Sequence, residues 1–276
     1  ISSMKDMIID NLVDEAIPAS EFTPEEEVTL RLMMEAGLFY GLSRSKANPK
    51  MKPYISSAKS GIQIINLVQT LKSIKNAASI LKEKVKAGGL PMIVGTTPAV
   101  KGVARDLGVK FNIPYATERW LGGTLTNFKT IVARVQYLKK IRLEKETGKL
   151  EKYTKKEKLN IEREMNKLER LFSGLESMDK LPEIVIIFDL KSHDLAAREA
   201  SRMNITSIAI ANTNADPEAV DYPIVSNDRN PKSIEFIASY LGKAIEDGRR
   251  EAAEASKTVL AGQPQEAEFE KADVQS

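Results

Sequence analysis

Short apolar runs alternate with longer amphipathic segments along most of this 276-residue chain. The run 183–188 is almost continuously apolar, which is typical of a strand covered on both faces. The expected strands are residues 62–67, 91–94, 113–116, 183–188, 206–211 and 222–225. The expected helices are residues 24–36, 68–86, 98–104, 193–203 and 231–253, while residues 37–61 are basic and are expected to be irregular. This alternation predicts an α/β fold with a parallel sheet and helices on both of its faces.

One segment interrupts the alternation with two long helical patterns and no strand signal. Apolar residues recur three or four positions apart from Phe128 to Leu138, and again from Ile161 to Leu175. Such spacing predicts the apolar seam of a coiled coil. Gly148 and the polar residues after it separate the two patterns. We therefore expect an antiparallel hairpin about 30 Å long at 1.5 Å per residue.

The segment 118–129 combines the only tryptophan, Trp120, with the glycine pair Gly122-Gly123. Adjacent glycines favour a sharp turn or a close backbone approach over the interior of a helix or strand. Thr124 is expected to cap the following helix, because its hydroxyl can accept a hydrogen bond from a free amide of the first turn. A packed tryptophan beside a turn is the simplest interpretation of this segment.

Charge is strongly segregated, although the formal net charge of the chain is only +3. Residues 1–35 hold two basic and nine acidic residues, and residues 251–276 hold two and six. Residues 36–110 hold 13 basic and two acidic residues, and residues 129–170 hold 14 and seven. A basic middle between acidic ends predicts a polyanion-binding body, whose affinity depends on salt because each neutralised phosphate releases counterions. The alternative, a solvated surface of mixed charge, fits the acidic tail well and residues 36–110 poorly.

Composition excludes several functional classes. The chain has no cysteine and a single histidine, His193, which excludes disulfides, thiolate zinc sites and clusters of imidazole ligands. No apolar run approaches the ~20 residues needed to cross a bilayer. Neither the dinucleotide fingerprint nor the P-loop is present, and no acid–base pair stands out. An enzyme with a ligand beside Asp189, Asn212 to Asp216 and Gly95-Thr96-Thr97, all after expected strands, is the alternative.

Short motifs spread over residues 24–250 occur in an order and spacing that match a known family. They include Ala36-Gly37, Gly41, Asn48-Pro49-Lys50-Met51-Lys52-Pro53-Tyr54-Ile55, Ile64-Ile65-Asn66-Leu67, Val94-Gly95-Thr96, Arg119-Trp120-Leu121-Gly122-Gly123-Thr124-Leu125-Thr126-Asn127, Leu181-Pro182, Ala211-Asn212-Thr213-Asn214-Ala215-Asp216-Pro217 and Val220-Asp221. Each motif is weak alone, and in register they are highly specific. The chain resembles the family of bacterial-type small-subunit ribosomal protein number two, the universal uS2 family.

The resemblance implies a Rossmann-like (flavodoxin-like) parallel sheet flanked by helices, with an inserted antiparallel coiled-coil hairpin. It implies a structural constituent of the small ribosomal subunit that is not an enzyme, carries no cofactor and is not a homo-oligomer. Family members bind 16S ribosomal RNA between head and body and help to recruit the large OB-fold ribosomal protein that assists messenger RNA binding. The expected location is the ribosome in the cytoplasm, with no membrane and no small-molecule substrate. A free RNA-binding regulator or a laminin-receptor-like moonlighting protein is a further alternative.

The resemblance also implies which residues lie near RNA. The expected contacts are Arg44, Lys46, Asn48, Lys50, Lys52, Arg119, Trp120, Asn127, Lys129, Lys139 and Lys140. The cations are expected to bind phosphates, which fix position rather than read sequence. Asn48 and Asn127 either bond the RNA backbone or stabilise a turn or cap, and Trp120 either stacks on a base or braces the hairpin root. The hairpin lysines either lie along RNA or a partner protein, or only keep the surface soluble.

The chain departs from the family pattern beside these stretches. Phe39 and Leu42 replace histidines that usually precede the Asn-Pro-Lys-Met motif, and Glu118 stands where a histidine often precedes the Arg-Trp pair. Some relatives bind zinc, for which this chain could offer only carboxylates such as Asp189 and Asp216.

Together these patterns divide the chain into four parts. The expected parts are an acidic N-terminal extension (1–23), a Rossmann-like domain (24–123 and 176–253), the inserted hairpin (124–175) and an acidic, disordered tail (254–276). The acidic start lacks the pattern of a secretory signal or of an Arg/Ser-rich transit segment, which favours a bacterial cytoplasm, and a mature organellar protein, which would also lack a transit segment, is the alternative.

Overall fold

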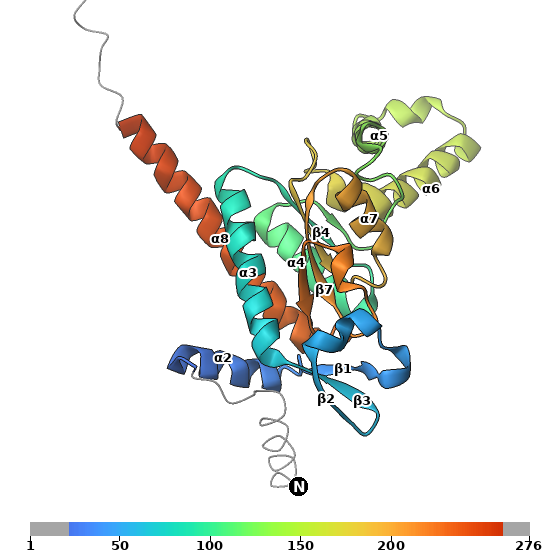
Figure 1. Ribbon diagram of the computed structural model, residues 1–276. Coiled ribbons are helices and arrows are strands. Elements are labelled where there is room, and N and C mark those ends of the chain that lie inside the picture. Colours follow the sequence, from blue (N-terminus) through green and yellow to red (C-terminus); the bar gives the residue numbers. More distant parts are fainter. Residues whose placement is uncertain (1–21, 262–276) are drawn as a thin grey trace, which may run out of the picture.

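A five-stranded parallel sheet organises the computed structural model, which describes residues 22–261 (Figure 1). Its strands are β4 (Pro91–Val94), β5 (Tyr115–Ala116), β6 (Ile184–Phe188), β7 (Thr206–Ala211) and β8 (Tyr222–Val225). They lie in the order β5-β4-β6-β7-β8, and every neighbouring pair is parallel. Numbered from β4, this is the 2-1-3-4-5 order of flavodoxin-like sheets. The expected fold class is therefore confirmed.

Helices cover both faces of this sheet. Successive strand residues point to opposite sides, so these apolar strands present side chains to both faces, and each face needs a covering layer. Ile184, Ile186 and Ile208 belong to a core on one face, and Val185, Ile187 and Ala209 belong to a core on the other. The helices of the first core are α2 (Pro24–Glu35), α3 (Leu67–Lys86), α4 (Pro98–Phe111) and α8 (Pro231–Ala261). The second core contains α7 (Asp194–Arg202) and the inner part of the hairpin. The sheet therefore separates two layers of helices, as the sequence predicts.

Residues 37–61 are regular, contrary to the expectation from the sequence. They contain β1 (Tyr40–Ser43), the short 3-10 helices η1 (Arg44–Lys46) and η2 (Pro49–Tyr54), and β2 (Ile55–Lys59). With β3 (Ile62–Ile65), these strands form a separate antiparallel sheet in the order β1-β3-β2. Ser60 and Gly61 join β2 to β3 with φ values of +50° and +79°, as a two-residue hairpin turn requires. β2 has mostly exposed, polar or small residues, so no apolar pattern marks it.

Two helices are longer than the sequence predicts. α4 continues past Ala104 to Phe111 and ends at Asn112, whose φ of +45° stops the helix. Two glycines within α4 hide this extension, because glycine is a poor helix former. α8 continues past residue 253 to Ala261, so the expected tail begins in helix. Residues 1–21 of the expected extension and residues 262–276 of the expected tail lie outside the described residues.

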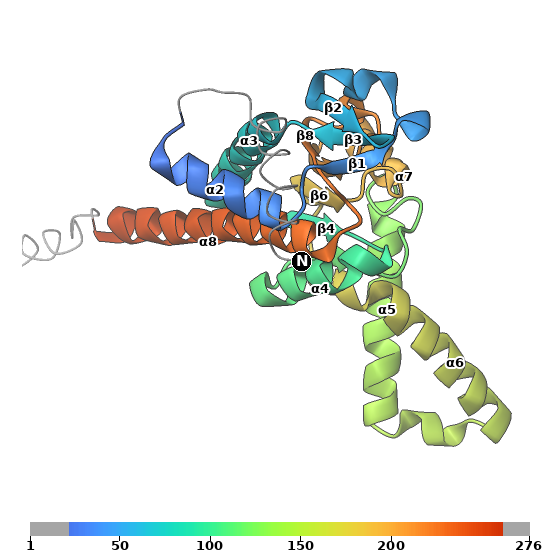
Figure 2. The ribbon, with the colours of Figure 1, turned by 90° about the horizontal axis from the view of Figure 1, so that it is seen from below.

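The segment between β5 and β6 folds into the expected helical hairpin. Its elements are α5 (Phe128–Glu146), η3 (Lys149–Lys152), α6 (Lys155–Phe172) and η4 (Ser173–Leu175). The two helices meet near the α/β domain and diverge away from it (Figure 2). Val135, Leu138 and Phe172 of the predicted seam are buried. Farther out, Ile161 and Leu150 line a hollow of about 210 Å³ between the helices.

Candidate nucleic-acid interface

The basic segment 44–54 lies against the loop that follows the carboxyl end of β7. The Leu42 amide donates to Thr213 Oγ1 (3.0 Å), and the Asn48 amide donates to the Thr213 carbonyl oxygen (2.8 Å). Gly41 permits this approach, because an added Cβ would lie 2.7 Å from the Thr213 side chain and 2.9 Å from the Gln63 carbonyl oxygen. The small sheet thus fixes the basic segment to the loop after β7.

Three cations of this segment are free for a ligand. Arg44, Lys46 and Lys52 are exposed, and none forms an ion pair with any residue between 22 and 261. Asn48 has a structural role, because its side-chain oxygen caps η2 by accepting from the Lys50 amide (3.0 Å). The structure thus places Arg44, Lys46 and Lys52 in one exposed segment. The side-chain oxygen of Asn48 is used to cap η2.

Lys50 differs from its neighbours, because carboxylates already surround its ammonium. Nζ of Lys50 lies 2.9 Å from Asp216 and 2.5 Å from Glu218. Hydrogen bonds to Glu218 and Asp216 raise the pKa of Lys50. Asp216 also caps η5 (Pro217–Ala219) by accepting from the Glu218 amide. Lys50 therefore fastens the basic segment to the loop between β7 and β8.

Trp120 lies inside the protein, at the root of the hairpin. Only 8% of its surface is exposed, and its indole N–H donates to Glu199 Oε1 (3.1 Å). A ring that stacks on a base must expose at least one face. The burial of Trp120 therefore favours the bracing role over stacking. The sequence did not indicate Glu199. The only hint in the sequence is that this acidic residue shares α7 with the alanines Ala196, Ala197 and Ala200, which are buried in the structure.

Thr124 does not cap the helix, contrary to the expectation. Its hydroxyl donates to the Leu121 carbonyl oxygen (2.6 Å), and its side chain is buried in the turn. α5 begins four residues later, at Phe128. The residue before it, Asn127, accepts a hydrogen bond from the Thr130 hydroxyl (2.8 Å) through its side-chain oxygen. The glycine pair extends the turn, which delays the start of the helix. Arg119 and Lys129 are exposed on either side of the turn.

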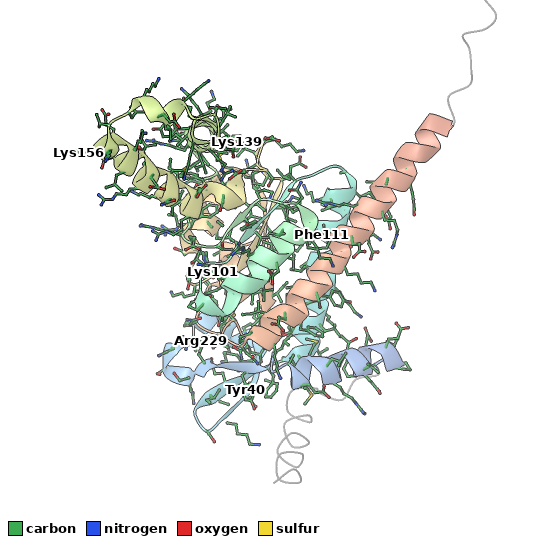
Figure 3. The ribbon with its side chains drawn as sticks, turned by 180° about the vertical axis from the view of Figure 1, so that it is seen from behind. Tyr40, Lys101, Phe111, Lys139, Lys156 and Arg229 are labelled. Carbon is green, nitrogen blue, oxygen red and sulfur yellow. The ribbon has the colours of Figure 1, made fainter. Side chains whose placement is uncertain are left out.

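The expected contacts on the hairpin form a second zone. Lys139 donates to the Glu176 carbonyl oxygen (3.1 Å), and Lys140 is exposed with only a loose contact to Glu144 (3.9 Å). Figure 3 shows Lys139 and Lys156 on the hairpin, at the opposite end of the molecule from Tyr40 on the small sheet. The structure therefore separates the expected RNA contacts into a small-sheet zone (Arg44, Lys46, Lys50 and Lys52) and a hairpin zone (Arg119, Lys129, Lys139 and Lys140).

The crevice where a flavodoxin-like sheet binds a phosphate is filled by the protein itself. His193 is buried, and its Nδ1 lies 2.8 Å from the Asp189 carbonyl oxygen. A carbonyl oxygen only accepts, so Nδ1 carries the proton and Nε2 accepts from the Thr96 amide (3.2 Å) and hydroxyl (3.0 Å). A Cβ on Gly95 would overlap Val100, so α4 packs directly on this loop. The Thr96 amide, which would otherwise be available to bind a phosphate, already donates to His193.

The carboxylates after the strands have protein partners as well. Asp189 accepts from the amide (3.0 Å) and hydroxyl (2.6 Å) of Ser192, and Asp216 pairs with Lys50. Within residues 22–261 no three metal-ligating side chains gather in one place. No helix in the same range is both long and apolar enough to cross a membrane.

Comparisons with known proteins agree with this fold. The sequence model of the family described as ribosomal protein S2 matches residues 33–248. The chain is 36% identical over 243 residues to the small ribosomal subunit protein uS2 of Coprothermobacter proteolyticus, covering 88% of this chain and 89% of that protein. It is 39% identical over 221 residues to the proteins of the same name from Mycobacteroides abscessus and Mycobacterium leprae, covering 80% of each chain. The chain therefore belongs to the ribosomal protein S2 family and is a structural protein of the small ribosomal subunit rather than an enzyme.

Proposed function

We propose that this chain binds 16S ribosomal RNA between the head and body of the small subunit, in the cytoplasm. Two zones would carry the binding: the small-sheet zone and the hairpin zone. The contacts would be to phosphates, so they would set the position of the protein without reading base sequence. The protein would act as a single copy and not as a homo-oligomer.

The observation that carries this proposal is the group of unpaired cations on the small sheet. Arg44, Lys46 and Lys52 are exposed and without ion-pair partners among residues 22–261. Hydrogen bonds from the small sheet to Thr213 hold their backbone in place, so that binding would order only the side chains. A fixed array of unpaired cations is suited to a polyanion, since it loses little entropy when phosphates bind.

The remaining expected contacts would have different roles. Arg119 and Lys129 would bind phosphates beside the hairpin root, and Lys139 and Lys140 would lie along RNA or a protein neighbour. Trp120, by contrast, would brace the root. Asn48 and Asn127 would support the backbone, because their side-chain oxygens already accept hydrogen bonds within the protein.

The hairpin would help to recruit the large OB-fold ribosomal protein that assists messenger RNA binding. It extends away from the α/β domain (Figure 2), and its outer part carries exposed lysines beside the hollow between α5 and α6. This geometry leaves both sides of the outer hairpin accessible to a neighbour. Substituting Lys155 and Lys156 by Glu should weaken the pull-down of the OB-fold protein by small subunits, without releasing this chain from them.

Sedimentation of cell lysate through sucrose gradients tests the main proposal. At moderate salt the chain should sediment with small subunits, and at high salt it should move to the top of the gradient. A chain that stays at the top of the gradient at every salt concentration would contradict the proposal and would favour a free regulator.

A further inference from the structure

One carboxylate organises the whole turn at the hairpin root. Oε1 of Glu199 accepts from the Trp120 indole N–H (3.1 Å) and the Gly123 amide (2.8 Å). Oε2 accepts from the amides of Leu125 (3.0 Å) and Thr126 (3.2 Å) and from the Thr126 hydroxyl (3.2 Å). Five donors from a seven-residue segment thus converge on a single side chain of α7.

The carboxylate is buried, and its charge is balanced only by these donors. Glu199 is 4% exposed, and no ion pair joins it to another residue of the described chain. Burial opposes ionisation, but the hydrogen bonds from Gly123, Leu125, Trp120 and Thr126 outweigh it and hold the pKa of Glu199 below its usual value. Hydrogen bonds to a buried charge are stronger than those between neutral groups. The turn is therefore held to α7 more firmly than a loop of this length would be by packing alone.

The turn conformation depends on this arrangement. Gly123 has a φ of +90°, a backbone conformation that residues other than glycine rarely adopt. Its amide is one of the donors to Glu199. Leu125 is fully buried beneath the turn. α5 follows directly at Phe128, so the direction in which the helix leaves the domain is set by a segment bonded to Glu199.

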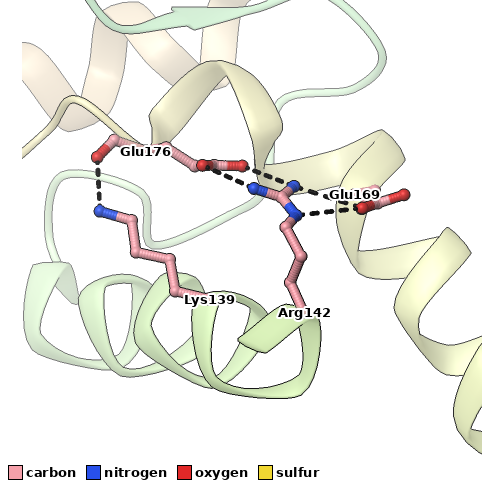
Figure 4. A network of polar contacts seen from close by, with 4 residues as sticks. All are labelled: Lys139, Arg142, Glu169 and Glu176. Atoms are coloured by element: carbon pink, nitrogen blue, oxygen red, sulfur yellow. Dashed lines mark hydrogen bonds and ion pairs between the residues drawn. The ribbon is translucent and has the colours of Figure 1, made fainter. Parts of the chain in front are cut away.

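The other root of the hairpin is fastened by independent contacts. Arg142 of α5 reaches across to Glu169 (3.2 Å) and Glu176 (3.1 Å), beside the bond of Lys139 to Glu176 (Figure 4). These contacts join α5 to α6 and to the segment after it. These contacts do not join the hairpin to α7. Among the described residues, only Glu199 forms hydrogen bonds between α7 and the turn that precedes α5.

We propose that Glu199 is a positioning residue that sets the conformation of the turn and the orientation of the hairpin, and thereby the presentation to RNA of Arg119 before the turn and Lys129 after it. The second part rests on the proposed function. Glu199 itself would touch no RNA, because the turn covers its carboxylate.

Spin-label distances measure the orientation directly. The chain has no cysteine, so labels can be placed at Asn160→Cys on α6 and Val109→Cys on α4 in the full chain. Glu199→Gln keeps the shape of the side chain but turns an amide group toward N–H donors. The distance distribution should broaden and its centre should shift. Trp120, as the only tryptophan, should also show a red-shifted emission. The matched control is Asp194→Asn, which removes a carboxylate from the same helix; among the described residues this carboxylate forms an ion pair only with Arg198.

The outcomes separate the two parts of the proposal. A distance distribution identical to that of the parent chain would overturn the role of Glu199. If Glu199→Gln does not fold, Thr126→Val, which removes one donor, decides by the same measurement. Affinity for 16S ribosomal RNA should fall about five- to tenfold in Glu199→Gln, with the salt dependence unchanged because no cation is lost. A moved hairpin with unchanged affinity would overturn the RNA part alone. Failure of the parent chain to bind this RNA would contradict the proposed function and leave the distance result standing.

Discussion

Nζ of Lys50 lies 2.9 Å from Oδ2 of Asp216, in the middle of a segment whose other cations have no ion-pair partner among residues 22–261. This ion pair distinguishes Lys50 from neighbouring lysines that look equivalent to it in the sequence. Lys50 and Lys52 are two positions apart and both exposed, but only Lys52 has a charge that no described carboxylate balances. Phosphate contacts should therefore differ between them.

The pair predicts unequal salt effects. Lys52→Ala should lower the slope of log affinity against log salt by about 1, as expected for one lost phosphate contact. Lys50→Ala should change the slope less, because Asp216 and Glu218 already neutralise this ammonium. Filter binding to 16S ribosomal RNA over a range of salt concentrations gives both slopes. An equal loss in the two variants would show that Lys50 leaves its carboxylates and binds phosphate.

A second prediction concerns the packing of α4 on β5. A Cβ on Gly108 would lie 2.8 Å from Tyr115 Cγ, so Gly108→Ala should lower the free energy of unfolding by about 1–3 kcal/mol. Gly102, in the same helix, has no atom within 4 Å of its added Cβ, so Gly102→Ala should raise it by about 0.5–1 kcal/mol. Urea unfolding measures both. Equal stabilities would show that α4 does not lie against Tyr115 as described.

Asp228 is predicted to destabilise the native state at neutral pH. Burial is the main cause of its raised pKa, and nearby Asp189 adds to it, while a hydrogen bond from Asn212 (2.6 Å) opposes the shift. An acid with a raised native pKa favours folding at low pH, and that contribution is lost as pH rises through the native pKa.

Asp228→Asn should accordingly raise the free energy of unfolding at pH 7 by about 1 kcal/mol, since the amide oxygen can still accept from Asn212. The gain should disappear in acid, where the native carboxyl is protonated. Denaturant unfolding at several pH values checks this. Asp179→Asn, at an exposed carboxylate that forms no ion pair among residues 22–261, is the control. A loss of stability at pH 7 in Asp228→Asn would contradict the interpretation.

Glu199 should have the opposite pH dependence. Its pKa is lowered from 4.5, so its stabilising contribution is complete above that unfolded value and is lost as pH falls through the native pKa. At pH 7, Glu199→Gln should cost about 2–4 kcal/mol, because buried donors lose a charged partner. The difference between parent and variant should shrink below pH 4.5. A constant difference down to strong acid would show that the charge of Glu199 does not stabilise the turn.

The fold was largely predictable because its signals are local. The run 183–188 and the spacing around Val135 and Leu138 each indicate an element without knowledge of its neighbours. β2 was not predictable, because an exposed strand with serines has no apolar alternation and is held by pairing with β3. The start of α5 was misplaced, because the hydroxyl of Thr124 bonds to the turn before it.

The candidate site was less predictable than the fold, because its roles depend on contacts between distant segments. The sequence indicates which lysines are present but not that Asp216, 166 positions away, holds Lys50. It shows Trp120 but not Glu199, which is 79 positions later. His193 was visible as the only histidine, yet its bond to Thr96 becomes apparent only when α7 lies beside the loop after β4.

RNA binding through the small sheet is tested by the salt dependence of binding to 16S ribosomal RNA for a triple variant, Arg44→Ala, Lys46→Ala and Lys52→Ala. Its control is Lys72→Ala, Lys84→Ala and Lys243→Ala, which removes equal charge from the face formed by α3 and α8. If these three cations bind phosphates, the slope of log affinity against log salt should be lower by about two to three in the first variant and close to the parent value in the second. Equal slopes for the parent and the first variant would contradict RNA binding through the small sheet.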